Sequence, residues 1–293
     1  MRELIKLGQQ SCYIKGFTNT GVYRQSENEV YVIDPGTDEN EGREIEEVLQ
    51  KRGWKLKGIL CTHCHSDHTG ANAYLQGVHS CPVFAYGIEA VFINNSILDP
   101  MVACGGYPID DIMGSNIYAE SCICFDTEHA EFPKEIEVVE LPGHSMEHAG
   151  YRLPDGTFFV GDTLIESRII RKYPLSYIYN PEDVLKTLEN MKSMEASVFA
   201  PAHAEPVTDI SELIEANTEN IYEVSGMVLD LCETPADMEE IANGIFNRCG
   251  VKMNCEKYIL IMGIVRTYIC WLKKRGRLEC LVQDNRLLWR AVK

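Results

Sequence analysis

The sequence predicts an α/β fold with a smaller, mostly helical C-terminal domain. Up to about Pro206, short β-type runs alternate with helical segments, which is typical of layered α/β architecture. Beyond that residue the pattern becomes largely helical. The chain has 293 residues, of which 45% are hydrophobic and 24% charged, so it can bury a substantial core without needing metal to fold. We therefore expect two domains, at residues 1–206 and 207–293.

The first domain is expected to contain at least five strands. Runs rich in apolar and β-branched residues predict them at residues 30–33, 58–61, 137–141, 157–160 and 197–200. Residues 82–133 show few clear strand signals. This range is expected to form an insertion or lid over the site and to set substrate choice.

Helix ends in the first domain carry local signals. A helix is predicted over residues 42–52, because apolar residues recur there at helical spacing and Gly53 can end it. Asn180 followed by Pro181 predicts the start of another helix, which runs to about Met194.

The second domain is expected to hold two helices followed by a hairpin. The helices are expected from a Thr234-Pro235 cap to about Gly250 and over residues 258–274. The two strands are expected at residues 278–282 and 287–292, with a turn at Asp284-Asn285. From residue 251 onward ten Lys or Arg stand against three acids, a net charge of +7 that leaves −24 for the remainder.

Composition excludes several classes of protein. The net charge of −17 argues against a surface coated by nucleic acid. Residues 1–17 lack the apolar stretch of a signal peptide, and the apolar run 258–272 is interrupted by Arg266 and too short to span a bilayer. Twelve scattered cysteines then predict reduced thiols and a cytoplasmic location without a membrane partner. Cys122 and Cys124 could hold a soft metal, although structural zinc sites generally use a C-x2-C pair.

The segment GILCTHCHSDHTG predicts a metal site. An apolar strand runs directly into His63, and His65 shares its face because side chains two apart in an extended backbone point the same way. Asp67 and His68 fall where the chain turns into a helical segment at residues 71–75, so they can reach a second ion. Asp67 could also cap that helix, but capping or packing does not account for three histidines within six residues.

Further ligands are expected at the ends of later strands, because a catalytic zinc ion commonly takes three protein ligands plus water. His144 lies in LPGHSMEHAGY, Asp162 in FFVGDTL and His203 in VFAPAH, each after an apolar run. These turns and loops are where functional side chains usually lie.

The motifs together resemble the metallo-β-lactamase superfamily, in its glyoxalase II-like branch. They are H-x-H-x-D-H at 63–68, G-H-S at 143–145, G-D-T at 161–163 and P-A-H at 201–203, and the resemblance covers about residues 1–206. It implies a four-layer αββα metallo-β-lactamase sandwich with the site at one edge of the paired sheets. It also implies a first metal on His63, His65 and His144, a second on Asp67, His68 and His203, and Asp162 as the bridge. Two divalent ions are expected, zinc first and iron or manganese as alternatives.

The implied function is hydrolysis of a small ester, thioester or lactone by a metal-bridging hydroxide, with Asp67 orienting the hydroxide and carrying a proton. Phosphodiester or nucleic-acid cleavage at the same site is the alternative within hydrolases. An iron-dependent persulfide dioxygenase would need one metal, and a non-enzymatic nucleic-acid-binding regulator would be expected to have degenerate ligands.

The C-terminal helices and hairpin resemble the winged-helix domain appended to many members of this superfamily. Its basic residues allow nucleic-acid binding, but docking on the acidic body is favoured. The expected partner is a small-molecule substrate, and a homo-oligomer is left open.

Other residues have less specific signals. His148 could orient a ligand or substrate, whereas His79 and His129 match no motif and are expected at the surface or in packing. Asp34 could hydrogen-bond to a ligand histidine or simply form a turn before Pro35. Tyr107 and Cys104 could line the pocket or lie in a solvent-facing turn.

Overall fold

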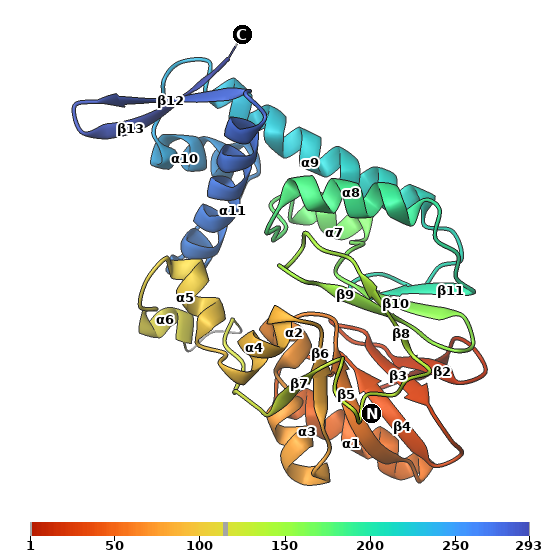
Figure 1. The fold of residues 1–293 in the computed structure, drawn as a ribbon. Helices are drawn as coiled ribbons and strands as arrows, with labels where there is room; N and C mark the ends of the chain where they lie inside the picture. Colours follow the sequence, from red (N-terminus) through yellow and green to blue (C-terminus); the bar gives the residue numbers. More distant parts are fainter. Residues whose placement is uncertain (1, 114–116, 293) are drawn as a thin grey trace.

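Two mixed β-sheets form the centre of the structure, a computed structural model that describes residues 2–113 and 117–292 (Figure 1). The seven-stranded sheet has the order β1 (Leu4–Lys6), β2 (Ser11–Ile14), β3 (Thr20–Arg24), β4 (Glu29–Ile33), β5 (Lys55–Cys61), β6 (Val83–Ala85) and β7 (Cys124–Asp126). The four-stranded sheet has the order β11 (Val198–Pro201), β10 (Thr157–Gly161), β9 (Ala149–Arg152) and β8 (Glu137–Glu140). The α/β fold class is confirmed.

Strand direction changes within each sheet. β1 to β4 pair antiparallel, and β4 to β7 pair parallel. In the second sheet β8, β9 and β10 pair antiparallel, whereas β10 and β11 are parallel. All five predicted strands are present, as β4, β5, β8, β10 and β11.

Alternating side chains in the strands produce four layers. In β4, Val30 and Val32 pack beneath the helices on the outside of the first sheet, while Tyr31 and Ile33 face the second sheet. In β10, Phe159 faces the same core between the sheets, and its neighbour Phe158 packs against the helices outside the second sheet. The order of layers is therefore helix, sheet, sheet, helix.

The outer helices follow their caps. α1 (Glu39–Arg52) and α3 (Asn72–His79) contribute to the core outside the first sheet, and α8 (Pro181–Met191) contributes to that outside the second. Helix α1 begins three residues before the predicted Gly42, because the Asp38 side chain accepts a hydrogen bond from Glu41 N. Asn180 caps α8 as predicted, and Pro181 is its first residue.

The range 82–133 is more closely integrated with the sheet than an insertion would be. β6 and β7, near its two ends, extend the first sheet in parallel. Between them lie α4 (Ile88–Asn94), α5 (Leu98–Cys104) and α6 (Asp110–Met113). A role as a lid would therefore belong to these helices, and it stays a prediction.

The two predicted C-terminal helices and the hairpin are present in order, and one more helix that was not individually predicted precedes them. They are α9 (Ser211–Leu231), α10 (Met238–Arg248), α11 (Cys255–Lys274), β12 (Leu278–Gln283) and β13 (Arg286–Ala291), and α7 (Ser167–Lys172) precedes α8. The predicted cap at Thr234-Pro235 is wrong. Asp237 caps α10 instead, because its side chain forms a reciprocal capping box with Glu240.

Helices α9 and α11 connect the C-terminal part to the sandwich. Ile214 of α9 packs against the second sheet, whereas Val228, near the other end of α9, belongs to the core of the C-terminal helices. Helix α11 reaches α5 and α6 (Figure 1). The boundary at residue 206 remains a prediction. No helix in the described part of the chain has the length and apolarity needed to cross a bilayer.

Candidate active site

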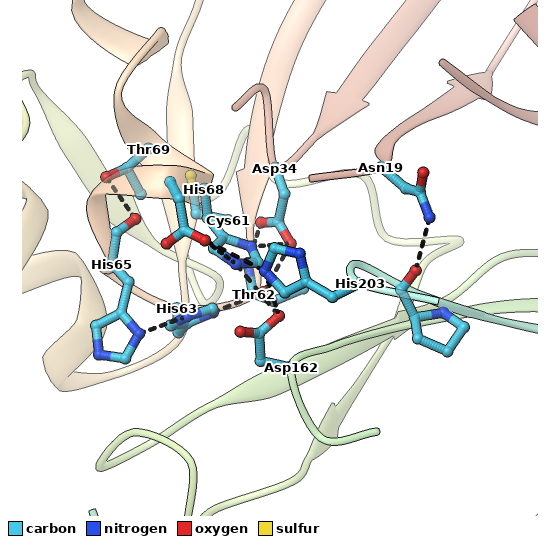
Figure 2. Close-up of polar contacts among 12 residues, drawn as sticks. Asn19, Asp34, Cys61, Thr62, His63, His65, His68, Thr69, Asp162 and His203 are labelled. Atoms are coloured by element: carbon cyan, nitrogen blue, oxygen red, sulfur yellow. Dashed lines mark hydrogen bonds and ion pairs between the residues drawn. The ribbon is translucent and has the colours of Figure 1, made fainter. Parts of the chain in front are cut away.

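The seven predicted ligand residues gather at one edge of the paired sheets. Figure 2 labels five of them, namely His63, His65, His68, Asp162 and His203. The loop after β5 and the short helix α2 (Ser66–Thr69) carry His63, His65, Asp67 and His68, and the β8–β9 loop carries His144. Asp162 directly follows β10, and His203 lies two residues after the end of β11. Because β10 and β11 are parallel, their carboxyl ends meet at the same edge, which is where ligands bind in many α/β sheets.

His63, His65 and His144 form a first group, whose ligand atoms lie within 4.8 Å of one another. His65 Nδ1 lies 2.9 Å from His63 Nε2 and 3.1 Å from His144 Nε2. Burial lowers the pKa of His63 well below its ordinary value and that of His144 to about 3. Both imidazoles are therefore neutral at pH 7, as metal coordination requires.

Asp67, His68 and His203 form a second group with the same 4.8 Å limit. Asp67 Oδ2 lies 3.2 Å from His203 Nε2 and 3.6 Å from His68 Nε2. Burial acts to lower the pKa of His203, but the carboxylates of Asp162 and Asp67 outweigh it and raise this pKa to about 9. Burial acts to raise the pKa of Asp67, but His68 and His203 outweigh burial and lower this pKa to about 2.

Asp162 lies between the two groups. Its Oδ2 is 3.4 Å from His144 Nε2, while its Oδ1 is 3.2 Å from His68 Nε2 and 3.4 Å from His203 Nε2. His68 Nε2 and Asp162 Oδ1 are buried and have no hydrogen bond of normal geometry among the described residues. Buried polar atoms are rarely left in this way without a ligand. Imidazole and carboxylate donors at these spacings fit the binding of divalent metal.

Asp34 positions His68 from behind. Its carboxylate accepts hydrogen bonds from Thr62 N at 2.8 Å and Thr62 Oγ1 at 2.7 Å, and its Oδ2 lies 3.0 Å from His68 Nδ1 (Figure 2). The Asp34 backbone has a φ of 52°, in the left-handed region that Asp tolerates better than most residues. The predicted hydrogen bond to His68, a candidate ligand, is therefore present, while the turn before Pro35 stays a prediction.

His148 supports Asp162 through its backbone. The buried His148 ring accepts a hydrogen bond at Nε2 from Asp162 N at 3.2 Å. Burial lowers the pKa of His148 well below its ordinary value, which keeps this nitrogen an acceptor. Gly161 allows its backbone to lie close to the side chains of His148 and Thr62. It has a φ of 52°, and a Cβ there would lie 2.5 Å from both His148 Nε2 and Thr62 Oγ1.

Glu89 joins the loops that carry the first group. This buried residue of α4 accepts hydrogen bonds from Cys64 N at 2.9 Å, Ser145 Oγ at 2.7 Å and Glu147 N at 2.9 Å. Cys64 lies between His63 and His65, and Ser145 follows His144. The spacing of the three histidines thus depends on one carboxylate from a different helix.

The remaining candidates lie outside this site. His129 stacks on Phe125 with ring centroids 4.4 Å apart, and His79 ends α3. Tyr107 is 89% exposed, which favours the solvent-facing turn. All twelve cysteines are free, and no metal-binding group among the described residues contains Cys122 or Cys124.

Comparison with known proteins agrees with this geometry. Residues 13–203 match the metallo-beta-lactamase superfamily. The chain belongs to this superfamily. It is 27% identical over 214 residues to a hydroxyacylglutathione hydrolase of Shewanella baltica, covering 71% of this chain and 70% of the relative. A hydroxyacylglutathione hydrolase of Rhizobium meliloti is 32% identical over 134 residues, covering 43% of this chain and 41% of the relative.

Solved structures show the same fold along the whole chain. A metallo-beta-lactamase family protein from Thermus thermophilus has a TM-score of 0.68 at 18% identity and covers 100% of this chain and 98% of its own. A beta-lactamase domain protein from Burkholderia ambifaria has a TM-score of 0.69 at 17% identity, covering 99% and 94%. With its His and Asp groups, the chain is a metallohydrolase of the metallo-β-lactamase fold, homologous to hydroxyacylglutathione hydrolase.

In this superfamily member, a cleft opens beside the predicted ligand residues. It consists of two cavities, of about 150 Å³ and about 180 Å³, that share the lining residues Ala103, Tyr177 and Leu260. The first cavity is also lined by His65 and Asp67. We call these two cavities the substrate cleft. Its walls come from α5, α11 and the loop before α8.

Three residues near the site were not found from the sequence: Glu89, Asp99 and Tyr177. Glu89 and Asp99 belong to α4 and α5, inside the range predicted as an insertion. The one available signal for Glu89 is an acidic residue within the otherwise apolar run IEAVFI. The Tyr177 ring meets His65 edge-on at 4.6 Å and His144 at 5.8 Å, contacts that depend on how the loop before α8 folds back.

Proposed function

We propose that this metallohydrolase cleaves thioesters, with esters and lactones as related substrates. Asp162 is the observation that carries the proposal, because its two oxygens face different groups of metal-binding residues. A shared carboxylate suits two cations that lie close together. The similarity to proteins named hydroxyacylglutathione hydrolase favours a thioester among acyl substrates.

Two metal ions are part of the proposal, with zinc expected and iron or manganese as alternatives. The first would be held by His63, His65 and His144, the second by Asp67, His68 and His203, with Asp162 between them. When bound, such ions lower the pKa of a water to near neutrality and polarise the acyl oxygen under attack.

Asp67 is the proposed catalytic residue. Its side chain is 29% exposed and lines the substrate cleft, so it can accept a proton from the attacking water. The hydroxide oxygen then bonds to the acyl carbon, the carbon–sulfur bond breaks, and the leaving thiolate takes the proton back from Asp67. Tyr177 covers His65 and His144 and shields this chemistry from bulk solvent.

The test measures metal per chain in protein purified without added metal, and turnover on thioester, lactone and phosphodiester substrates. We expect two metal ions and thioester hydrolysis. His65→Ala should lose both hydrolysis and metal, whereas His129→Ala, a histidine outside the site, should lose neither. Full thioesterase activity in the His65→Ala variant would contradict the proposal.

The same measurements separate the alternatives. A phosphodiesterase would cleave the phosphodiester and not the thioester. A persulfide dioxygenase would contain one iron, consume oxygen on a persulfide and hydrolyse neither substrate. Of the basic residues near the C-terminus, Arg266 lines the substrate cleft, while Arg275 and Arg290 pair with Glu182 and Glu279. Nucleic-acid binding remains the less favoured alternative, and the winged-helix resemblance and the homo-oligomer remain predictions.

A further inference from the structure

The substrate cleft contains one carboxylate without a partner. Asp99, in the first turn of α5, lines the cleft beside His65 and Tyr177. No hydrogen bond or ion pair joins its side chain to another described residue, and the residue is half-buried at the wall of the cleft. Burial raises the pKa of Asp99. Nearby His65 acts to lower this pKa, whereas Glu89 and Asp67 act to raise it. A positively charged group placed here would offset that cost.

The other charged groups in or beside the cleft are already engaged or lie further out. Glu89 accepts its three hydrogen bonds from the loops of the first group. Asp67 faces His203. The exposed Arg266 lies next to Gly105, beyond the end of α5, and lines the outer cavity that Asp99 does not reach. Asp99 is thus the available charge closest to the ligand residues.

Aromatic side chains line the same space as this carboxylate. Asp99 and Tyr177 also line an adjoining pocket with Phe92 and Tyr179. Ring faces attract cations through their quadrupole, most strongly where water is excluded. A carboxylate among aromatic rings is the chemistry that recognises an ammonium group.

We propose that Asp99, with Tyr177, binds a positively charged ammonium group of the substrate. The inference rests on the proposed thioester hydrolysis and specifies its substrate class, namely thioesters that carry a cation rather than an anion. A leaving group that carries a carboxylate and no ammonium group, such as 3-mercaptopropionate, would be opposed by Asp99 at this place in the cleft. A purely structural role, in which Asp99 favours the N-terminus of α5, predicts no dependence on substrate charge.

The experiment compares three thioesters with the same butyryl group. Their thiols are thiocholine, which is cationic, N-acetylcysteamine, which is neutral, and 3-mercaptopropionate, which is anionic. We expect kcat/KM to be about tenfold higher for the cation than for the neutral compound, and lower again for the anion. Asp99→Asn should abolish the advantage of the cation and Asp99→Glu should retain it. Asp111→Asn, at an exposed position of α6, should change nothing.

Binding of non-hydrolysable thioethers tests the inference without turnover. S-methylthiocholine and S-methyl-3-mercaptopropionate are titrated calorimetrically into the wild-type holoenzyme and its Asp99→Asn variant. Tighter binding of the cation by wild type, lost in the variant, supports the inference. This holds even if no thioester is hydrolysed, because absence of hydrolysis would refute only the proposed function. Equal binding of the two thioethers, or a preference unchanged in the variant, would overturn it.

Discussion

His68 lies among three carboxylates, and its charge is therefore coupled to metal binding. Burial acts to lower its pKa, but Asp162, Asp67 and Asp34 outweigh burial and raise it well above the ordinary value. His203 has its pKa raised to about 9 for the same reason. Without metal, both imidazoles hold protons at neutral pH and pair with the acids. Metal needs them neutral, so loading the site must displace those protons.

We therefore expect metal affinity to increase with pH. Between about pH 6.5 and about pH 8.5, each histidine proton that the metal displaces should make metal binding about tenfold stronger per pH unit. The metal-free protein has the opposite trend in its free energy of unfolding. The contribution of the protonated histidines is fully present below about pH 6.5 and is lost as the pH passes about 9. Competition with a chelator across this range measures the affinity. An affinity that does not change with pH would show that His68 and His203 do not bind the metal.

Gly161 is the second residue whose effect follows from local geometry. Gly161→Ala places a methyl group against His148 and Thr62 at a backbone φ of 52°, so we expect a loss of about 1–3 kcal/mol in the free energy of unfolding. Denaturant unfolding of the metal-free protein measures it. Gly226→Ala is the control, because a Cβ in the middle of α9 meets nothing within 4 Å and should stabilise by about 0.5–1 kcal/mol. Equal effects of the two substitutions would contradict the crowding at Gly161.

Among the elements, a continuous apolar run explains why β5 and β10 could be predicted, whereas burial alone does not decide it, since the buried β2 and β3 were missed and the more exposed β8 was predicted. β5 and β10 are apolar runs covered on both faces, so their composition identifies them. β1 and β7 have three residues each and are partly exposed, and β6 is equally short, which gives no readable period. These strands exist because neighbouring strands supply hydrogen bonds, and a local pattern does not contain that information.

The same limit applies to the site. His144, Asp162 and His203 were predicted because each is a polar ligand type at the end of an apolar strand. Glu89 carries no such signal, since its role arises when α4 packs against two loops that lie 25 and 56 residues away in the sequence. Tyr177 likewise reaches the histidines through tertiary packing.

Glu89 provides a test of that helix–loop connection. Cys64 N and Ser145 Oγ donate to different oxygens of Glu89. In Glu89→Gln one of these oxygens becomes an amide nitrogen that cannot accept, so one of the two loops is released and the first group should lose its spacing. We expect metal affinity to fall about 10- to 100-fold while the fold is retained. Competition with a chelator and circular dichroism measure the two quantities. Glu120→Gln, at an exposed position before β7, is the matched control, and equal affinities in both variants would contradict the role of Glu89.

At the scale of the whole molecule, the substrate cleft depends on contacts between distant parts of the chain. Helix α5 belongs to the segment between β6 and β7, and α11 to the C-terminal part, yet the two helices are in contact (Figure 1). The candidate metal-binding residues come from the sandwich alone, whereas the cleft above them needs α11. Metal binding and substrate binding should therefore be separable by changes in this helix.

Leu260→Trp is the substitution that separates them. Leu260 of α11 lines both cavities of the substrate cleft but none of the metal-binding groups, so a larger ring should fill the space above Asp67 and leave the ligands in place. We expect KM to rise about tenfold or more for butyryl thioesters, with metal content and unfolding temperature close to wild type. Cys270→Trp, at an exposed position of the same helix, should leave KM unchanged. Loss of metal in Leu260→Trp would instead show that α11 acts on the metal centre. An unchanged KM would show that substrate approaches Asp67 by a route that does not pass between α5 and α11.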